Sequence, residues 1–91
     1  MPFEKVWWVY MIVTDKGNLY TGISTDVERR WQEHCDVAQG KKNARGARFF
    51  RTQRPQKIVY LEQAGVHGDA ARRERNLKAL SREEKLKLAD L

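Results

Sequence analysis

An apolar run, a polar turn and a second apolar run make up the first 23 residues. Residues 5–13 are nearly all apolar, β-branched or aromatic, which is typical of a central strand covered on both faces. A turn cluster at 14–18 and the apolar run at 19–23 complete a predicted β-hairpin. If the loop holds an odd number of residues, Tyr10 and Tyr20 project from the same face, because side chains alternate with a period of two.

A helix is predicted next, since Thr25 and Glu28 fit a capping box and Gly40 suits a left-handed helix end. Arg30 and His34 border its apolar stripe, so we expect both at the edge of the buried face. The stripe consists of Val27, Trp31, Cys35 and Ala38.

The remaining chain predicts a third strand at 57–63 and a helix at 70–80 with Asp69 as its N-cap. Ser81 and Glu84 offer a second capping box for a final helix. Strands and helices in this order indicate an α/β fold, with a small three-stranded, mostly antiparallel sheet flanked by helices.

Composition narrows the class of protein. The 91 residues are 41% apolar and 33% charged, an ordinary mix for one globular domain spanning 1–91. A single cysteine, Cys35, cannot form an internal disulfide, and we expect it to be a small buried apolar residue. The apolar run at 6–13 is too short to span a bilayer, and the N-terminus lacks a secretory pattern. We therefore expect a soluble, cytoplasmic protein.

Positive charge is concentrated in one segment. Residues 37–61 contain no Asp or Glu and contribute +7, whereas the rest of the chain sums to −1, so the net charge of +6 comes from this segment. The spacing of three residues favours a stripe along one side of a winding segment, which suits a phosphate backbone. The alternative is a solvated basic loop with Phe49 or Phe50 in the core. The candidate nucleic-acid-binding residues are Lys41, Lys42, Arg45, Arg48, Arg51 and Arg54.

Glu74 lies on the apolar side of its predicted helix. An unpaired buried carboxylate is costly, so such a group normally has a cationic partner or a metal ion. The alternative is a helix-surface ion pair with Lys78, four residues later.

Together, Trp8-Val9-Tyr10, Tyr20-Thr21-Gly22, Arg30, His34 and Glu74 resemble the signature of the GIY-YIG nuclease superfamily. The chain is most similar to its small stand-alone bacterial members. In this family a helical arginine follows the second tyrosine by ten residues, and a helical glutamate binds one divalent metal. Trp8-Val9 replaces Gly-Ile of the first motif, and the asparagine that follows the glutamate helix in larger members has no counterpart.

The resemblance implies metal-dependent hydrolysis of phosphodiester bonds in DNA. One Mg²⁺ or Mn²⁺ ion on Glu74 would bind a nonbridging oxygen and the leaving group, and Arg30 would neutralise the scissile phosphate. Tyr10, with Tyr20 beside it, would position and deprotonate the water, and His34 is the competing base. Tyrosine is a weak base unless nearby cations lower its pKa from about 10.

Three function classes stay open at this stage. The first is a nuclease of structured or single-stranded DNA, with DNA favoured over RNA and a protein partner that supplies specificity. The second is a nucleic-acid-binding protein with weak or no catalysis, for which the basic segment suffices. The third is a protein-interaction module that uses Phe49 and Phe50. The two tyrosines also suit plain packing residues with one wet end.

Overall fold

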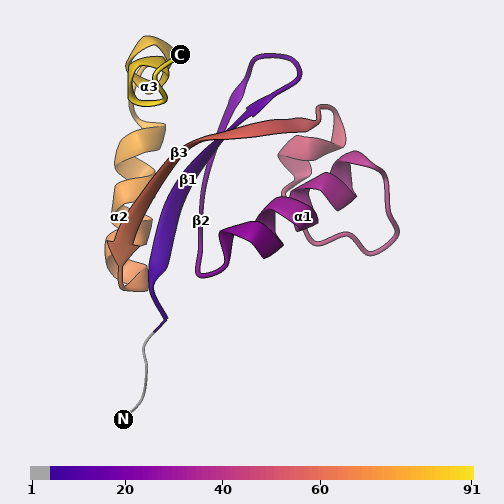
Figure 1. Cartoon of the computed structure of the whole chain (residues 1–91), viewed down its shortest axis with the longest axis horizontal. Helices are drawn as coiled ribbons and strands as arrows, with labels where there is room; N and C mark the ends of the chain where they lie inside the picture. The colour runs from indigo at the N-terminus through magenta and orange to yellow at the C-terminus, as the bar shows by residue number, and fades with distance from the viewer. Residues whose placement is uncertain (1–4) are drawn as a thin grey trace.

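A computed structural model, which describes residues 5–91, shows one three-stranded antiparallel sheet with helices on both faces (Figure 1). The strand order is β2-β1-β3, which makes β1 the central strand. The predicted fold class is confirmed. The elements are β1 (Trp7–Thr14), β2 (Leu19–Ser24), α1 (Val27–Ala38), the 3₁₀ helix η1 (Arg48–Arg51), β3 (Pro55–Gly65), α2 (His67–Lys78) and α3 (Arg82–Leu88).

The hairpin has the predicted register. Tyr10 pairs with Gly22 and Ile12 pairs with Tyr20 across β1 and β2. Paired residues point to the same side of a sheet, and alternate residues of one strand do so too. Tyr10 and Tyr20 therefore share a face, as predicted for an odd-numbered loop, since five residues separate the last paired positions, Val13 and Leu19.

The two faces of the sheet have separate cores. On one face Val9 packs with Ala70 and Leu77 of α2. On the other face Tyr10 and Ile12 pack with Phe50, and the apolar side chains of α1 surround them. In Figure 1, α1 and η1 lie on one side of the sheet, and α2 and α3 lie on the other. The candidate site residues are thus divided between two layers.

Two predicted helix starts are wrong by one to three residues. Asp26, and not Thr25, caps α1, because its side chain accepts a hydrogen bond from the backbone N–H of Arg29 at 3.0 Å. The buried Ser24 hydroxyl accepts from the Asp26 backbone N–H at 2.9 Å, which fixes this turn. Helix α2 begins at His67 without a side-chain cap, so Asp69 lies in its first turn, where a carboxylate favours the helix dipole.

The capping box of the last helix is confirmed. Ser81 accepts from the backbone N–H of Glu84, and the Glu84 side chain accepts from the Ser81 backbone. Over residues 5–91, none of the helices is long and apolar enough to cross a membrane.

The buried face of α1 keeps Val27, Trp31 and Ala38 of the predicted stripe and adds His34. His34, expected at the edge of this face, is 0% exposed and is the residue that α1 buries completely. Cys35, expected to be buried, is only partly so. The ring centroid of Phe50 lies 4.5 Å from that of His34, so Phe50 offers an aromatic surface to this side of the helix.

Candidate active site

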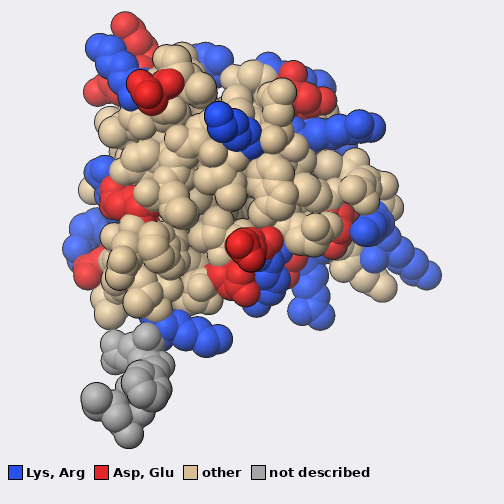
Figure 2. All heavy atoms as spheres, viewed as in Figure 1, with Lys and Arg blue, Asp and Glu red and all other residues tan. Residues whose placement is uncertain are grey.

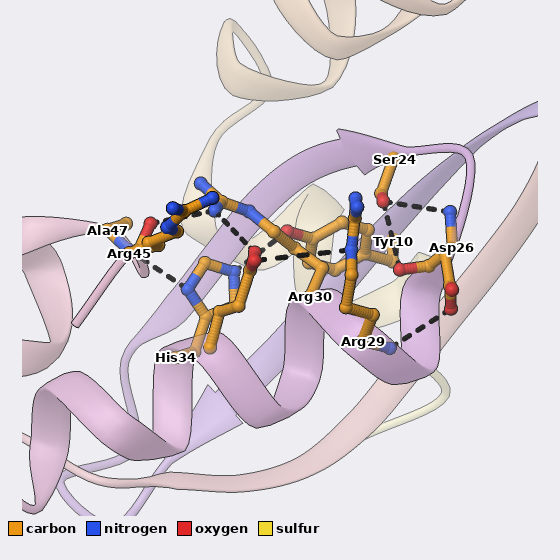
Figure 3. Close-up of polar contacts among 9 residues, drawn as sticks. Tyr10, Ser24, Asp26, Arg29, Arg30, His34, Arg45 and Ala47 are labelled. Atoms are coloured by element: carbon orange, nitrogen blue, oxygen red, sulfur yellow. Dashed lines mark hydrogen bonds and ion pairs between the residues drawn. The ribbon is translucent and has the colours of Figure 1, made fainter.

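Tyr10 and His34 form a buried polar pair between the sheet and α1 (Figure 3). The phenolic Oη of Tyr10 lies 2.9 Å from Nε2 of His34. Tyr10 is 1% exposed and His34 is 0% exposed. A hydrogen bond in such a dry environment is strong, and removing one partner leaves the other unsatisfied.

Gly22, the last residue of the second motif, makes room for this pair. A Cβ at position 22 would lie 2.5 Å from Tyr10 Oη and 2.7 Å from its Cζ. The Tyr10 ring therefore crosses from the central strand over β2 at the one position without a side chain. The glycine is required for space.

His34 is held at both ring nitrogens. Nδ1 accepts a hydrogen bond from the backbone N–H of Ala47 at 3.1 Å, and Nε2 faces Tyr10. Burial, and then the positive charge of Arg30, lower the pKa of His34 to about 4, against a smaller opposing effect of Glu33. The imidazole is therefore neutral at pH 7, and without exposed surface it can reach a substrate only through Tyr10.

Arg30, also on α1, belongs to the same site. Its Nη1 donates to Glu33 Oε1 and to the backbone oxygen of Arg45, both at 2.9 Å. The side chain is 28% exposed, so the guanidinium is available to an anion from solution. Its charge acts on Tyr10, where it favours the phenolate and opposes the rise in pKa.

The balance of effects nevertheless raises the pKa of Tyr10 well above its usual value. Burial is the largest cause, followed by the nearby Tyr20, and the carboxylate of Glu74 adds to the rise. Tyr10 is thus a protonated phenol at neutral pH in the protein alone. A base role for it requires additional positive charge beside Oη.

Tyr20 closes the side of the site that faces η1. Its ring centroid lies 5.1 Å from that of His34 and 6.3 Å from that of Tyr10. It stacks on Phe49 at 5.4 Å and meets Phe50 edge-on at 5.0 Å. The same face therefore carries both tyrosines, but in the protein alone Tyr20 makes aromatic contacts.

Glu74 approaches from α2, on the other layer. Glu74 forms the ion pair with Lys78 that was the alternative prediction: Lys78 Nζ lies 3.4 Å from Glu74 Oε2. The Glu74 side chain is 22% exposed, and its charge reaches Tyr10 strongly enough to affect the phenol. Tyr10 of β1 is therefore affected by the charges of Arg30 from α1 and Glu74 from α2.

A metal ion at this site would have few protein ligands. Within residues 5–91 there is no group of three His, Cys, Asp or Glu side chains that could hold one. Mg²⁺ usually binds proteins through one or two carboxylates and completes its octahedral shell with water and substrate phosphate oxygens. The single, partly exposed Glu74 carboxylate fits that mode of binding.

The basic segment of residues 41–57 forms a loop around η1. All six candidate nucleic-acid-binding side chains are exposed, whereas Phe50 is fully buried and Phe49 packs against the same core. The exposed basic side chains and the packed phenylalanines fit the alternative of a basic loop with Phe49 or Phe50 in the core, and nucleic-acid binding by these basic residues stays a prediction. In Figure 2 basic side chains project along the right-hand edge, where α1 and this loop lie.

A hollow of about 420 Å³ lies between the end of α1 and this loop. Among the residues that the structure describes, its lining includes three cations and no carboxylate. Lys41 is paired with Asp36 at 3.2 Å, while Arg48 and Arg51 lie one 3₁₀ turn apart. The lining residues are Val37, Gly40, Lys41, Asn43, Ala44, Gly46, Arg48 and Arg51.

The GIY-YIG catalytic domain matches residues 6–87 of this sequence. The chain belongs to the GIY-YIG family. A UPF0213 protein of Pseudomonas aeruginosa is 43% identical to it over 84 residues, which cover 92% of this chain and 74% of that relative. A GIY-YIG domain-containing protein of Invertebrate iridescent virus 6 is 35% identical over 100% of this chain and 86% of its own length.

A solved structure supports the fold of this GIY-YIG chain. The solution NMR structure of a UPF0213 protein from Bacillus halodurans is 32% identical, with a TM-score of 0.55. The match covers 93% of this chain and 83% of that one. Membership of the GIY-YIG family places this chain in a nuclease-like family.

The backbone groups of Arg45 and Ala47 that hold Arg30 and His34 were not among the predicted site residues. No residue type identifies a backbone donor or acceptor, so nothing at positions 45 or 47 indicates this role. Gly46, between them, is the one available signal, because glycine in a structured loop often marks a close approach of two backbones.

Proposed function

We propose that this protein is a divalent-metal-dependent endonuclease that hydrolyses phosphodiester bonds in DNA. The observation that carries the proposal is the convergence at Tyr10 Oη. His34 lies within hydrogen-bond distance of this atom, and the charges of Arg30 and Glu74 both act on it. A phenol on which both a cation and a carboxylate act is suited to a reaction in which negative charge develops on a phosphate.

Each side chain has a role that follows from its surroundings. Arg30, which keeps exposed surface, binds the scissile phosphate. Tyr10 hydrogen-bonds the attacking water, and positive charge near Oη lowers its pKa towards that of a base. Glu74 would hold Mg²⁺ or Mn²⁺, which when bound supplies charge neutralisation at the nonbridging and leaving oxygens.

The substrate class follows from the basic loop. Arg48, Arg51 and Lys41 surround a hollow that is open to solvent and free of acidic lining, which suits a phosphate backbone. A surface of this size offers little for reading base edges, so we propose structured or single-stranded DNA with specificity supplied by a partner protein. RNA with the same backbone charge is the less favoured substrate.

One observation favours a second candidate, a nucleic-acid-binding protein with weak or no catalysis. Lys78 forms an ion pair with Glu74, the only carboxylate proposed to hold a metal ion. An ion that binds Glu74 must displace this lysine or share the carboxylate with it. The basic loop would still bind DNA in either case.

A nicking assay separates the two candidates. We expect the purified protein to cut supercoiled plasmid or flap substrates with Mg²⁺ or Mn²⁺, and Arg30→Ala and Glu74→Ala to stop cutting while DNA binding persists. Glu83→Ala, an exposed carboxylate on α3, is the matched control and should cut normally. If the wild-type protein binds DNA and never cuts with any divalent metal, the second candidate is correct.

A further inference from the structure

Two loop residues, Arg45 and Ala47, hold the two α1 side chains of the candidate site (Figure 3). The backbone oxygen of Arg45 accepts a hydrogen bond from Arg30 at 2.9 Å. The backbone N–H of Ala47 donates to Nδ1 of His34 at 3.1 Å. Gly46 lies between them. A short stretch of backbone thus orients both a cation and an imidazole.

Gly46 lets this stretch lie directly against the helix. A Cβ at position 46 would overlap the backbone oxygen of Glu33 and would lie 2.7 Å from His34 Cα. These are backbone atoms within α1, so they cannot move aside as the end of a flexible side chain would. No positive φ is involved at this glycine, and the requirement is therefore for space alone.

The contact with Ala47 decides where the proton of His34 resides. A backbone N–H only donates, so Nδ1 must present its lone pair. A neutral imidazole carries one hydrogen, which is then on Nε2. The hydrogen bond to Tyr10 therefore runs from Nε2–H to Oη, and the hydrogen of the Tyr10 hydroxyl points away from His34.

We propose that Gly46 is a positioning residue, and that the Ala47 backbone N–H it brings to His34 fixes this histidine as a hydrogen-bond donor to Tyr10. In that state His34 cannot accept the Tyr10 proton at Nε2, because this nitrogen already carries one. The Nε2–H bond instead stabilises negative charge on Oη whenever it develops. The catalytic consequence rests on the proposed nuclease function, whereas the proton position does not.

The wild-type protein gives the first test. A long-range ¹H–¹⁵N spectrum of the histidine rings at pH 7 should show a protonated Nε2 and a bare Nδ1 for His34. The exposed His67 is the only other histidine, and His67→Gln assigns the signals. A proton on Nδ1 of His34 would overturn the proposal.

A pair of glycine variants gives the second test. Gly46→Ala should disturb the His34 ring signals and lower cleavage by roughly 10- to 100-fold, as for other groups that orient a catalytic side chain through a second hydrogen bond. Gly68→Ala is the control, because a Cβ there meets nothing within 4 Å. Unchanged His34 signals and unchanged cleavage in a folded Gly46→Ala protein would refute the positioning role.

A third comparison decides the matter if Gly46→Ala does not fold. Glutamine at position 34 can offer an amide N–H near the place of Nε2 but has no basicity, and leucine offers neither. Under the proposal His34→Gln retains cleavage at least about tenfold above His34→Leu, consistent with one retained hydrogen bond to a charged oxygen. Equal loss in both variants would show that His34 is needed as a base. A wild-type protein that cuts nothing refutes the nuclease function, while the ring spectrum still decides the proton position.

Discussion

Tyr10 of the central strand and His34 of α1 are joined at 2.9 Å, with the tyrosine 1% exposed and the histidine 0% exposed. The pair connects the first motif strand to the helix that carries Arg30. It therefore affects both the stability of the layer and the electrostatics of the candidate site.

The first prediction concerns pH. Since burial lowers the pKa of His34 from its usual 6.5 to about 4, the unfolded chain binds more protons than the folded one between these values. The free energy of unfolding should thus fall as pH decreases through this window, with a contribution of about 2 kcal/mol between pH 7 and pH 5. Urea denaturation at both pH values measures it.

The control for this prediction must account for other groups near His34. Arg30 and Glu33 of α1 and the phenols of Tyr10 and Tyr20 face the ring. His34→Gln should remove most of the pH dependence, whereas His67→Gln, at an exposed site, should behave like the wild type. Identical pH dependence in the wild type and His34→Gln would contradict the assignment.

The second prediction concerns Gly22. Alanine at this position would place its Cβ 2.5 Å from Tyr10 Oη, so the phenol must leave its position beside His34. We expect Gly22→Ala to cost about 1–3 kcal/mol of unfolding free energy, the usual range for overpacking, and to abolish cleavage. Thermal unfolding and the nicking assay check this. A variant with wild-type stability and activity would show that the site tolerates a displaced Tyr10.

The third prediction separates the two phenylalanines. Phe50 is 0% exposed, whereas Phe49 is half-buried and stacks on Tyr20. Phe50→Ala should cost about 3–5 kcal/mol of unfolding free energy, and Phe49→Ala about 1 kcal/mol. If urea denaturation gave equally small losses of unfolding free energy for both variants, Phe50 would not be a core residue. It could then contact a protein partner.

Local features of the site could be predicted from the sequence. The shared face of Tyr10 and Tyr20 follows from the period of a strand and a five-residue loop, which are both set by neighbouring residues. The capping box at Ser81 and Glu84 is equally local. Such features depend on backbone geometry over a few residues, so the pattern alone is sufficient.

The depth of His34 could not be predicted in this way. Its burial depends on contacts with Phe50 and with the loop at Ala47, both more than ten residues away. A histidine at the margin of an apolar stripe can be buried when both of its ring nitrogens have hydrogen-bond partners. Those partners are a tyrosine on another element and a backbone N–H, and neither is visible in the pattern around position 34.

The fourth prediction concerns DNA binding by the basic loop. Each phosphate contact on a single strand contributes about 0.7 to the slope of log affinity against log salt. Arg51→Ala, in the lining of the hollow, should weaken binding and reduce this slope by that amount. Arg72→Ala on α2 removes an exposed charge from the other layer and should leave the slope unchanged. Fluorescence anisotropy with a labelled oligonucleotide at several salt concentrations distinguishes them, and equal effects would indicate non-specific attraction to the whole surface.

The last prediction concerns the ion pair between Glu74 and Lys78. A divalent cation at Glu74 competes with the Lys78 ammonium, 3.4 Å from the same carboxylate. Exposed pairs of this kind contribute at most about 1 kcal/mol, so Lys78→Met should tighten Mn²⁺ binding by about fivefold or less. Calorimetric titration of the protein with Mn²⁺ measures this without any cleavage. Lys87→Met, an exposed lysine on α3, should leave the affinity unchanged, and Glu74→Gln should abolish binding. Undiminished Mn²⁺ binding by Glu74→Gln would place the metal elsewhere in the protein.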